Sequence, residues 1–302
     1  MRKQNQDNVI AIVCSDIHLS LNPPVYRSNE PDWFVAMARP FDEIESLQMT
    51  YNCPVLCCGD VFDKWNSPPE LVNWTMGHLP RYFYSISGQH DQPEHDINQI
   101  RRSAWQTLCL GGSLKPPWRA PISANIYGFN YGEVVEPPEC ESYLCVAIIH
   151  QYSWIPKRCY ENAPKKGLVS SKRKEFEGYD VVFAGDNHIP FMTKINGGKT
   201  TFVNCGSIMR RKSDDDFDPS VWLLFGSGRV SRHRLCTKQD VYLERQEQEP
   251  SNPGIDLTRL IESLERLGSD IADFQQAVKM ALETKKVSNS IKSIIYDAME
   301  DK

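Results

Sequence analysis

Acidic, imidazole and amide side chains follow five apolar stretches of this sequence, each at the point where the stretch ends. The stretches are Val9–Cys14, Val55–Cys58, Tyr82–Ser87, Leu144–Ile149 and Val181–Ala184, and the polar residues that follow are Asp16, His18, Asp60, Gln89, His90, His150, Asp186 and His188. Apolar runs of this length are typical of buried strands. Ligands of open α/β sheets bind beyond the carboxyl ends of the strands. We therefore predict five parallel or mixed strands that deliver these side chains to one shared rim.

This set of side chains has the composition of a site for divalent cations, which require several oxygen and imidazole ligands on rigid elements. Residues two apart in a strand point to the same face, and the two oxygens of one carboxylate can bridge two ions. Two cations roughly 3.5–4 Å apart activate water and clamp the oxygens of an in-line phosphoryl displacement. The predicted ligands are Asp16, His18, Asp60 and His188 for a first ion, and Asp60, Gln89, His150 and Asp186 for a second.

His90 is left over from this count of ligands. It can protonate the leaving oxygen or stabilise charge on the phosphorus, so His90 and the adjacent Asp91 are the candidates for catalysis. A single Asp-x-His or Gly-Asp is weak evidence, because turns are rich in these residues. The prediction depends on the ordered set, since four of the seven histidines follow apolar runs beside a carboxylate or an amide. The remaining histidines, His78, His95 and His233, receive no role.

The elements that must position these residues can be located from periodicity. Helical spacing of apolar residues predicts a helix over 33–50, broken or kinked at Pro40, and a second over about 96–109; Pro68-Pro69 opens a third. Further strands are expected at Ile126–Phe129, Thr200–Cys205, Val221–Phe225 and Val230–Leu235, the last two joined as a hairpin through Gly226-Ser227-Gly228.

Composition limits the class of protein. With 302 residues and 40% hydrophobic residues, the chain can form one or two domains with a sizeable core. A net charge of −5 excludes a globally basic nucleic-acid binder. The ten cysteines form no CxxC pair, and neither a signal core nor a run of ~18 apolar residues occurs. We therefore expect reduced thiols, a cytoplasmic location and no membrane segment.

The ordered series SDIH, GDVFD, GQHD, His150 and GDNH resembles the calcineurin-like metallophosphoesterase superfamily, whose pattern is DxH, GDxxD, GNHD/E, H and GHxH. The match covers about residues 9–210. GDVFD also resembles the GDLFD of SbcD-type DNA-repair nucleases, and Val203–Ser207 resembles the segment that follows their last metal motif. The resemblance implies an α/β fold, an αββα sandwich of two mixed sheets flanked by helices. It also implies two metal ions at the positions given above and His90 as the catalytic histidine.

Two positions depart from the family pattern. Gln89 replaces an asparagine, so its carbonyl must reach the ion from one methylene further away, and Asp186 replaces the first histidine of GHxH. Both changes make the second site richer in oxygen. Hard oxygen ligands suit Mn²⁺, which the nuclease branch often uses, or Mg²⁺, rather than Zn²⁺ or Fe²⁺. The alternative is a weakened second site with little catalysis.

A basic insertion suggests the substrate. Residues 156–178 contain seven basic and three acidic side chains and begin shortly after His150, so we expect them beside the metal rim. Tyr152, Trp154 and Tyr160 could stack on bases, and basic charge fits a nucleic-acid backbone. The predicted contacts are Lys157, Arg158, Lys165, Lys166, Lys172, Arg173, Lys174, Arg210 and Arg211. A solvated loop is the alternative.

Three functions are compatible with these features: a DNA exonuclease or endonuclease of SbcD type, a phosphoesterase for small molecules or nucleotides, and a non-catalytic binding module with a degenerate site. The domains are predicted as a catalytic domain over 1–245, then a linker and three amphipathic segments over 246–302. That extension is too short for the capping domain of SbcD-type nucleases. It could dock an SbcC-type coiled-coil ATPase, support a homodimer, or pack on itself or on the core.

Overall fold

The computed structural model describes residues 8–139, 143–160, 163–212 and 217–243, which belong to the first of two compact units, Met1–Glu244. The linker and amphipathic segments predicted over 246–302 lie outside the described residues, so their role stays a prediction. Among the helices in the described part, none is both long and apolar enough to cross a membrane.

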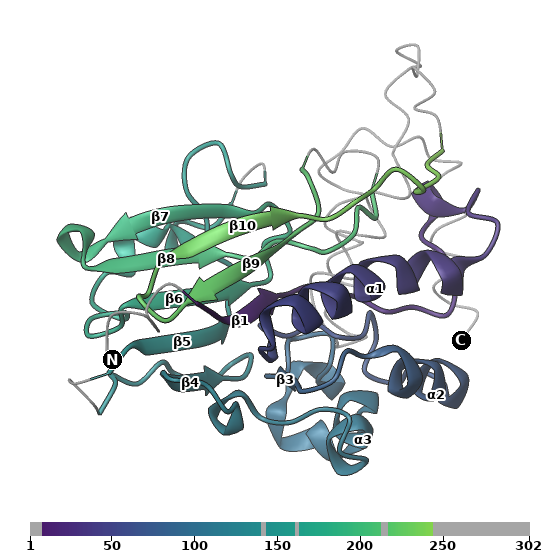
Figure 1. The fold of residues 1–302 in the computed structure, drawn as a ribbon, viewed down its shortest axis with the longest axis horizontal. Coiled ribbons are helices and arrows are strands. Elements are labelled where there is room, and N and C mark those ends of the chain that lie inside the picture. The colour runs from purple at the N-terminus through teal and green to yellow at the C-terminus, as the bar shows by residue number, and fades with distance from the viewer. Residues whose placement is uncertain (1–7, 140–142, 161–162, 213–216, 244–302) are drawn as a thin grey trace, which may run out of the picture. The chain divides into compact units, whose positions relative to one another are not determined.

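Within the described residues, ten strands form two mixed sheets of five, which confirms the predicted α/β fold class (Figure 1). The first sheet has the order β10 (Val230–Arg234), β9 (Ser220–Phe225), β1 (Val9–Cys14), β2 (Val55–Cys57), β3 (Phe83–Ser85); the second has the order β4 (Asn125–Phe129), β5 (Cys145–His150), β6 (Val181–Gly185), β8 (Thr200–Asn204), β7 (Phe191–Ile195). In the first sheet, β2 pairs parallel to its neighbours β1 and β3, whereas β9 and β10 extend the sheet antiparallel. In the second, β4, β5, β6 and β8 run parallel and β7 closes the edge antiparallel.

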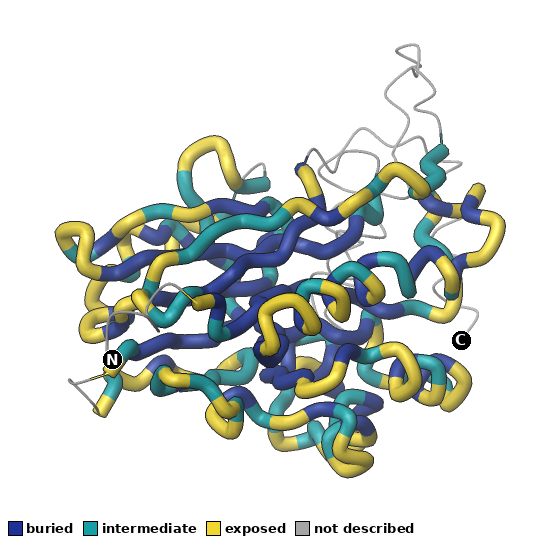
Figure 2. The backbone as a smooth tube through the Cα atoms, viewed as in Figure 1, coloured by how far each residue is buried: buried dark blue, intermediate teal, exposed yellow. Residues whose placement is uncertain are grey.

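Alternating side chains of the first sheet enter two different cores, as the twofold repeat of a strand requires. One set, which includes Ile12 and Val55, packs against three α-helices: α1 (Trp33–Tyr51), α2 (Pro69–His78) and α3 (Ala104–Leu110). The other set, which includes Val13 and Leu56, meets residues of the second sheet such as Ile148 and Phe183. The inner strands are therefore buried on both faces (Figure 2).

The outer face of the second sheet is covered by the connection between β5 and β6. Because these strands are parallel, the chain must cross from the carboxyl end of β5 to the amino end of β6. Val169, Phe176 and Tyr179 of this crossover pack on the sheet. Much of the predicted basic insertion is thus a structural layer. Its helical parts are the 3₁₀ turns η5 (Lys165–Gly167) and η6 (Val169–Ser171); the others in the described chain are η1 (Val25–Arg27), η2 (Pro93–His95), η3 (Ile97–Arg102), η4 (Pro117–Arg119) and η7 (Asn196–Gly198).

Three local predictions need correction. Helix α1 is continuous through Pro40, so the predicted break there is wrong, while a kink stays a prediction. The helix predicted over about 96–109 is divided at Ser103, whose hydroxyl accepts a hydrogen bond from Gln106 N and so begins α3 anew. Strand β7 was not predicted, because the polar residues Thr193 and Lys194 interrupt its apolar pattern at the sheet edge. The hairpin of β9 and β10 is confirmed.

Candidate metal centre

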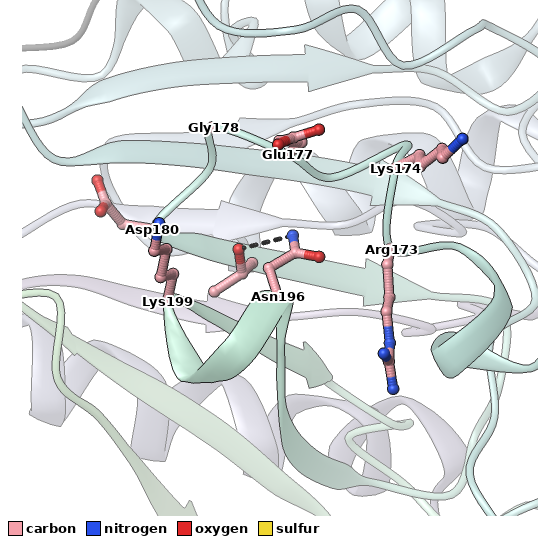
Figure 3. A pocket seen from close by; sticks show the side chains of 8 residues that line it. Arg173, Lys174, Glu177, Gly178, Asp180, Asn196 and Lys199 are labelled. Carbon is pink, nitrogen blue, oxygen red and sulfur yellow. Dashed lines mark hydrogen bonds between the residues drawn. The ribbon is translucent and has the colours of Figure 1, made fainter.

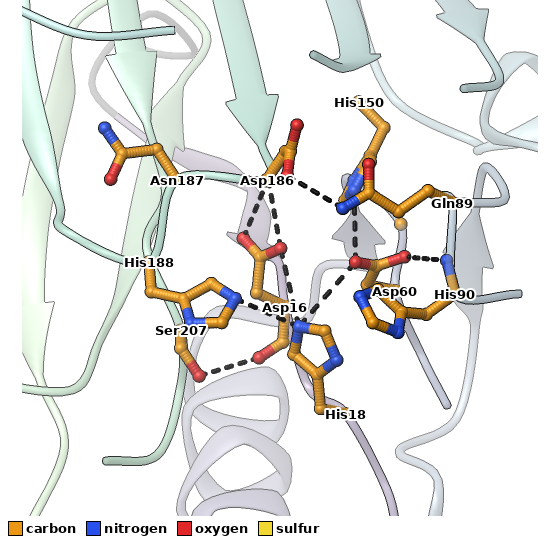
Figure 4. Close-up of polar contacts among 12 residues, drawn as sticks. Asp16, His18, Asp60, Gln89, His90, His150, Asp186, Asn187, His188 and Ser207 are labelled. Carbon is orange, nitrogen blue, oxygen red and sulfur yellow. Dashed lines mark hydrogen bonds and ion pairs between the residues drawn. The ribbon is translucent and has the colours of Figure 1, made fainter. Parts of the chain in front are cut away.

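The carboxyl ends of strands from both sheets meet at one place. His150 ends β5 in the second sheet, and its Nδ1 lies 2.6 Å from the carbonyl oxygen of Cys58, directly after β2 in the first sheet. The structure brings the predicted ligands together there (Figure 4). Three groups of side chains have ligand atoms within 4.8 Å of one another: Asp16, His18 and His188; Asp16, Asp60 and His150; and His18, Asp60 and His90.

Backbone strain accompanies this convergence. Asp16, His18, Asp60 and Asp186 have φ angles of 51°, 50°, 53° and 83°, in the left-handed region that residues other than glycine seldom occupy. Hydrogen bonds between the loops hold two of these conformations: Asp16 N donates to Gly59 O at 3.1 Å and His18 N donates to Asp60 O at 3.0 Å. The strained loops after β1 and β2 therefore brace each other and aim their side chains inward.

Asp60 occupies the centre of the cluster. Its Oδ2 lies 3.2 Å from His150 Nε2 and 3.6 Å from His18 Nε2, while its Oδ1 accepts a hydrogen bond from His90 N at 2.9 Å. One oxygen thus lies beside a predicted ligand of each ion, so Asp60 is placed to bridge the two ions through Oδ2 rather than through both of its oxygens.

The tautomer of His150 tests whether cations fit. A carbonyl oxygen only accepts hydrogen bonds, so the contact with Cys58 O places the proton of a neutral imidazole on Nδ1. In that neutral form Nε2, 3.2 Å from Asp60 Oδ2, carries a lone pair that can ligate a cation, whereas a protonated ring would form an ion pair with the carboxylate. His18 and His188 contact each other through their Nε2 atoms at 3.1 Å, a hydrogen bond in which one ring donates and the other accepts. Imidazole nitrogens and carboxylate oxygens are the donor set that divalent cations require.

The pKa values indicate the same shortage of positive charge. Burial, followed by repulsion from Asp60 and Asp186, raises the pKa of Asp16 to about 7 against the opposing effect of His150. Burial also raises the pKa of Asp186 above its ordinary value. Burial lowers the pKa of His188 to about 3, so its imidazole is neutral and able to ligate. The pKa of His150 is raised despite burial, because Asp60 attracts a proton to the pair.

Asp186 and Gln89, the two departures from the family pattern, contact each other. Gln89 Nε2 donates a hydrogen bond to Asp186 Oδ1 at 3.0 Å. The carboxylate of Asp186 does not belong to the three ligand groups found among the described residues. Its backbone amide donates to both carboxylate oxygens of Asp16, at 3.0 and 3.2 Å, and so positions a predicted ligand of the first ion.

His90 and Asp91 have different environments. His90 is half-buried, and its Nδ1 contacts the carbonyl oxygen of Asp63 at 2.9 Å, which leaves Nε2 as the free ring nitrogen. Asp91 is fully buried, and its carboxylate accepts the amides of Val61, Phe62 and Gly88 at 3.0–3.1 Å. These contacts tie the loops after β2 and β3 together and suit a positioning residue, and the catalytic role of Asp91 stays a prediction.

The predicted basic contacts lie in two places. Lys172 Nζ donates to Gln151 Oε1 at 2.9 Å, just past the carboxyl end of β5, and Asn187 donates to the backbone oxygen of Arg158, so both basic residues belong to loops beside the centre. Arg173 and Lys174 line a cavity of about 500 Å³ with Lys199 (Figure 3). That cavity adjoins Asp180 and Thr200, at the amino ends of β6 and β8. Arg173 and Lys174 therefore lie away from the rim that carries the predicted ligands.

The other predicted contacts have their own surroundings. Lys157, Lys165 and Lys166 are exposed on the crossover. Arg210 Nε donates to Phe217 O at 2.5 Å, whereas Arg211 Nη1 pairs with Asp63 Oδ1 at 2.6 Å, directly beside His18. Asp63 was not predicted as part of the site, although it is the last residue of the GDVFD motif. Tyr131 and His95 were not predicted either, and they lie at the edge of the site, where Tyr131 contacts the ring of His150.

Comparison with known proteins gives distant matches of fold. Neither a family model nor a curated protein matches the chain. Among solved structures, a dimetal phosphatase from Danio rerio is 10% identical, with 76% of this chain and 100% of that chain covered at a TM-score of 0.45. A metallophosphoesterase from Sphaerobacter thermophilus is 15% identical (76% and 89% covered, TM-score 0.39), and an archaeal phosphodiesterase is 11% identical (74% and 99%, TM-score 0.39).

Proposed function

We propose that the chain is a two-metal-dependent phosphodiesterase, and more specifically a DNA exonuclease or endonuclease of SbcD type acting in DNA repair, recombination or replication. The observation that supports it best is the position of Asp60 Oδ2, which faces His18 on one side and His150 on the other within a buried cluster. The cluster gathers carboxylate and imidazole ligand atoms within 4.8 Å of one another, and these are the donor types that divalent cations prefer.

The first ion would be held by Asp16, His18, Asp60 and His188, and the second by Asp60, His150, Asp186 and Gln89. When bound, the ions supply charge that activates water and stabilises the phosphorane-like transition state. The oxygen-rich second set favours Mn²⁺, with Mg²⁺ next.

The residues of the chain orient the substrate and move a proton. The Asp63 carbonyl oxygen contacts Nδ1 of His90 and so leaves Nε2 as the nitrogen that would donate to the leaving oxygen. Burial alone would lower the pKa of His90, but Asp60 and Asp63 raise it above its ordinary value and so favour the donating form. Lys172, together with the loop that carries Arg158, adds positive charge on one side of the rim and Arg211 on another, as a phosphate backbone requires.

One contact favours the alternative of a non-catalytic binding module. The hydrogen bond between Gln89 and Asp186 satisfies one oxygen of the carboxylate without a cation. Metal content distinguishes the two proposals, because a degenerate second site would retain one ion per chain.

The test combines metal analysis with hydrolysis. Chelated protein should regain activity with Mn²⁺ on linear DNA and on bis-p-nitrophenyl phosphate. His90→Asn should lower kcat by about 100-fold or more, and Asp60→Asn should lower metal content as well. His78→Asn, an exposed histidine on α2, is the matched control. Full activity with Zn²⁺ alone would contradict the Mn²⁺ preference, and cleavage of the small ester without cleavage of DNA would leave a small-molecule phosphoesterase.

Nucleic-acid binding has a separate test. Binding of catalytically inactive protein to DNA should weaken steeply with salt, and Lys172→Gln with Arg158→Gln should reduce the slope. Binding that does not respond to salt would remove the basic residues from the proposal. Docking of an SbcC-type ATPase by residues 246–302 is tested by truncation after Glu244, which should abolish it.

A further inference from the structure

Two aromatic residues without an assigned role continue outward from the metal centre. The ring centroid of Tyr131 lies 6.2 Å from that of His150 and 6.1 Å from that of His95, with interplanar angles of 68° and 80°. His150 is fully buried, Tyr131 is half-buried and His95 is exposed. The three rings therefore form a continuous series from the floor of the site to the solvent.

The backbone of Tyr131 is fixed relative to the predicted catalytic loop. Tyr131 N donates to Ser87 O at 2.9 Å, and Tyr131 O accepts from Gln92 Nε2 at 3.0 Å. The preceding residue, Asn130, accepts from both N and Oγ of Ser87 through its side chain. Ser87 and Gln92 are fully buried and flank the segment that carries Gln89 and His90. Tyr131 is therefore held at a constant distance from these two residues, which is how a substrate-contacting residue must be held.

The backbone at His95 has an uncommon conformation. His95 has a φ of 58° and follows Glu94 with a φ of 54°, so two consecutive residues occupy the left-handed region at this position. Such conformations persist where the surroundings impose them, and they are frequent at ligand sites.

We propose that Tyr131 and His95 form a nucleobase subsite, in which the base of a nucleotide esterified to the scissile phosphate stacks on these rings. The inference rests on the proposed phosphodiesterase activity and specifies its substrate. Flat π-faces beside a phosphate-binding centre suit a purine or pyrimidine, whereas a glycerol or methyl ester has no face to stack. Because stacking accepts every base, the subsite selects nucleotides without selecting sequence.

Two substrates with one leaving group isolate this contact. Thymidine 5′-(p-nitrophenyl phosphate) and methyl p-nitrophenyl phosphate both release p-nitrophenol and differ only in the group that remains on phosphorus. Tyr131→Ala should lower kcat/KM for the thymidine ester roughly 5- to 100-fold, mainly through KM, and should leave the methyl ester within about twofold. Tyr131→Phe should retain most of the activity, because it keeps the ring. His95→Ala should act in the same direction.

Tyr143→Ala is the matched control. Tyr143 is an exposed tyrosine just before β5, at the opposite end of the strand that ends in His150, on the order of 20 Å away. The Tyr143→Ala variant should leave kcat/KM for both esters unchanged. Equal losses on the two esters in Tyr131→Ala, or no loss on either, would overturn the proposal.

A binding measurement keeps the proposal independent of catalysis. Saturation-transfer NMR of thymidine 5′-monophosphate with the metal-loaded protein should show contact at the base protons, and Tyr131→Ala should abolish it. Absence of that contact in the wild-type chain overturns the subsite even if the esters are hydrolysed; its presence without hydrolysis overturns the proposed activity instead. Single-stranded oligonucleotides, used in the same experiment, distinguish a polynucleotide from a mononucleotide as the source of the base.

Discussion

The side-chain amide of Gln89 donates a hydrogen bond to Asp186, with Gln89 Nε2 3.0 Å from Asp186 Oδ1. This contact joins the carboxyl end of β6 in the second sheet to the loop after β3 in the first. Asp186 and Gln89 are also the two residues of the proposed second ion site that differ from the metallophosphoesterase pattern, which has a histidine and an asparagine at these positions. The metal preference of the protein should therefore depend on this pair.

Asp186→His should shift that preference toward Zn²⁺. The change replaces a hard oxygen ligand with an imidazole, which zinc accepts more readily than manganese does. Chelated protein would be dialysed against equal concentrations of Mn²⁺ and Zn²⁺ and its metal content measured. We expect the Zn²⁺ fraction to rise severalfold relative to the wild-type chain.

Asp180→Asn provides the control for the loss of a carboxylate, because Asp180 lies at the amino end of the same strand. It should leave the metal ratio unchanged. A wild-type chain that already selects Zn²⁺ over Mn²⁺ would contradict the role assigned to the pair.

Gly88→Ala should disrupt the centre through Asp60. A methyl group at Gly88 would collide with Asp60 N at 2.5 Å and with its side chain, and both are held by the surrounding loops. We expect weaker metal binding and a loss of about 2 kcal/mol or more in the free energy of unfolding, measured by urea denaturation and metal titration.

Gly77→Ala is the corresponding control. Gly77 lies in α2, where an added methyl group would meet no atom within 4 Å. Because alanine favours helix, this variant should be about 0.5–1 kcal/mol more stable. Equal effects of the two substitutions would refute the steric argument.

Asp91→Asn should weaken the centre without removing a ligand. The Asp91 carboxylate accepts two amides with Oδ2 and one with Oδ1, but an asparagine has only one oxygen, so at least one buried N–H must lose its partner. The expected cost is about 1–3 kcal/mol in unfolding free energy, with reduced metal affinity. Asp42→Asn, an exposed change on α1, should alter neither; a stable, fully metal-binding Asp91→Asn would show that the three amides do not position the centre.

Sequence periodicity and the order of the motifs predict the convergence of Asp16, Asp60 and His150, because carboxyl ends of parallel strands gather at one edge. The burial of individual side chains could not be inferred in the same way. Asp91 and His90 are adjacent polar residues of one motif, yet the Asp91 carboxylate is enclosed by backbone amides. Tyr131 is held beside the site by Ser87 and Gln92, through contacts between distant segments that no local pattern encodes. Basic residues occur throughout the crossover between β5 and β6. Their distribution in the sequence therefore did not show which of them lie beside the predicted ligands and which lie at the amino ends of the strands.

Glu30 should make the stability of the first unit depend on pH. Its side chain is fully buried, with Oε1 2.8 Å from Val241 N and two contacts of 3.1 Å to Arg39, and it pairs with the buried Arg27. Burial alone would raise the pKa of Glu30, but the Val241 amide and the two guanidinium groups lower it below its ordinary value. The folded state therefore binds this proton less tightly than the unfolded state.

The stabilisation from Glu30 is fully present above its unfolded pKa of about 4.3 and is lost as the pH falls through the lower folded pKa. Glu30→Gln leaves Asp240, 3.1 Å from Arg27 Nη2, as the remaining carboxylate beside the buried Arg27, and it weakens the contacts with Arg39 and Val241 N, so it should cost about 1–3 kcal/mol at pH 7. The difference between wild type and variant should shrink as the pH falls from about 5 to 3. Glu45→Gln, exposed on the same helix α1, should show no such difference. Urea denaturation across this range measures both, and a constant difference between wild type and Glu30→Gln would exclude the carboxylate as its source.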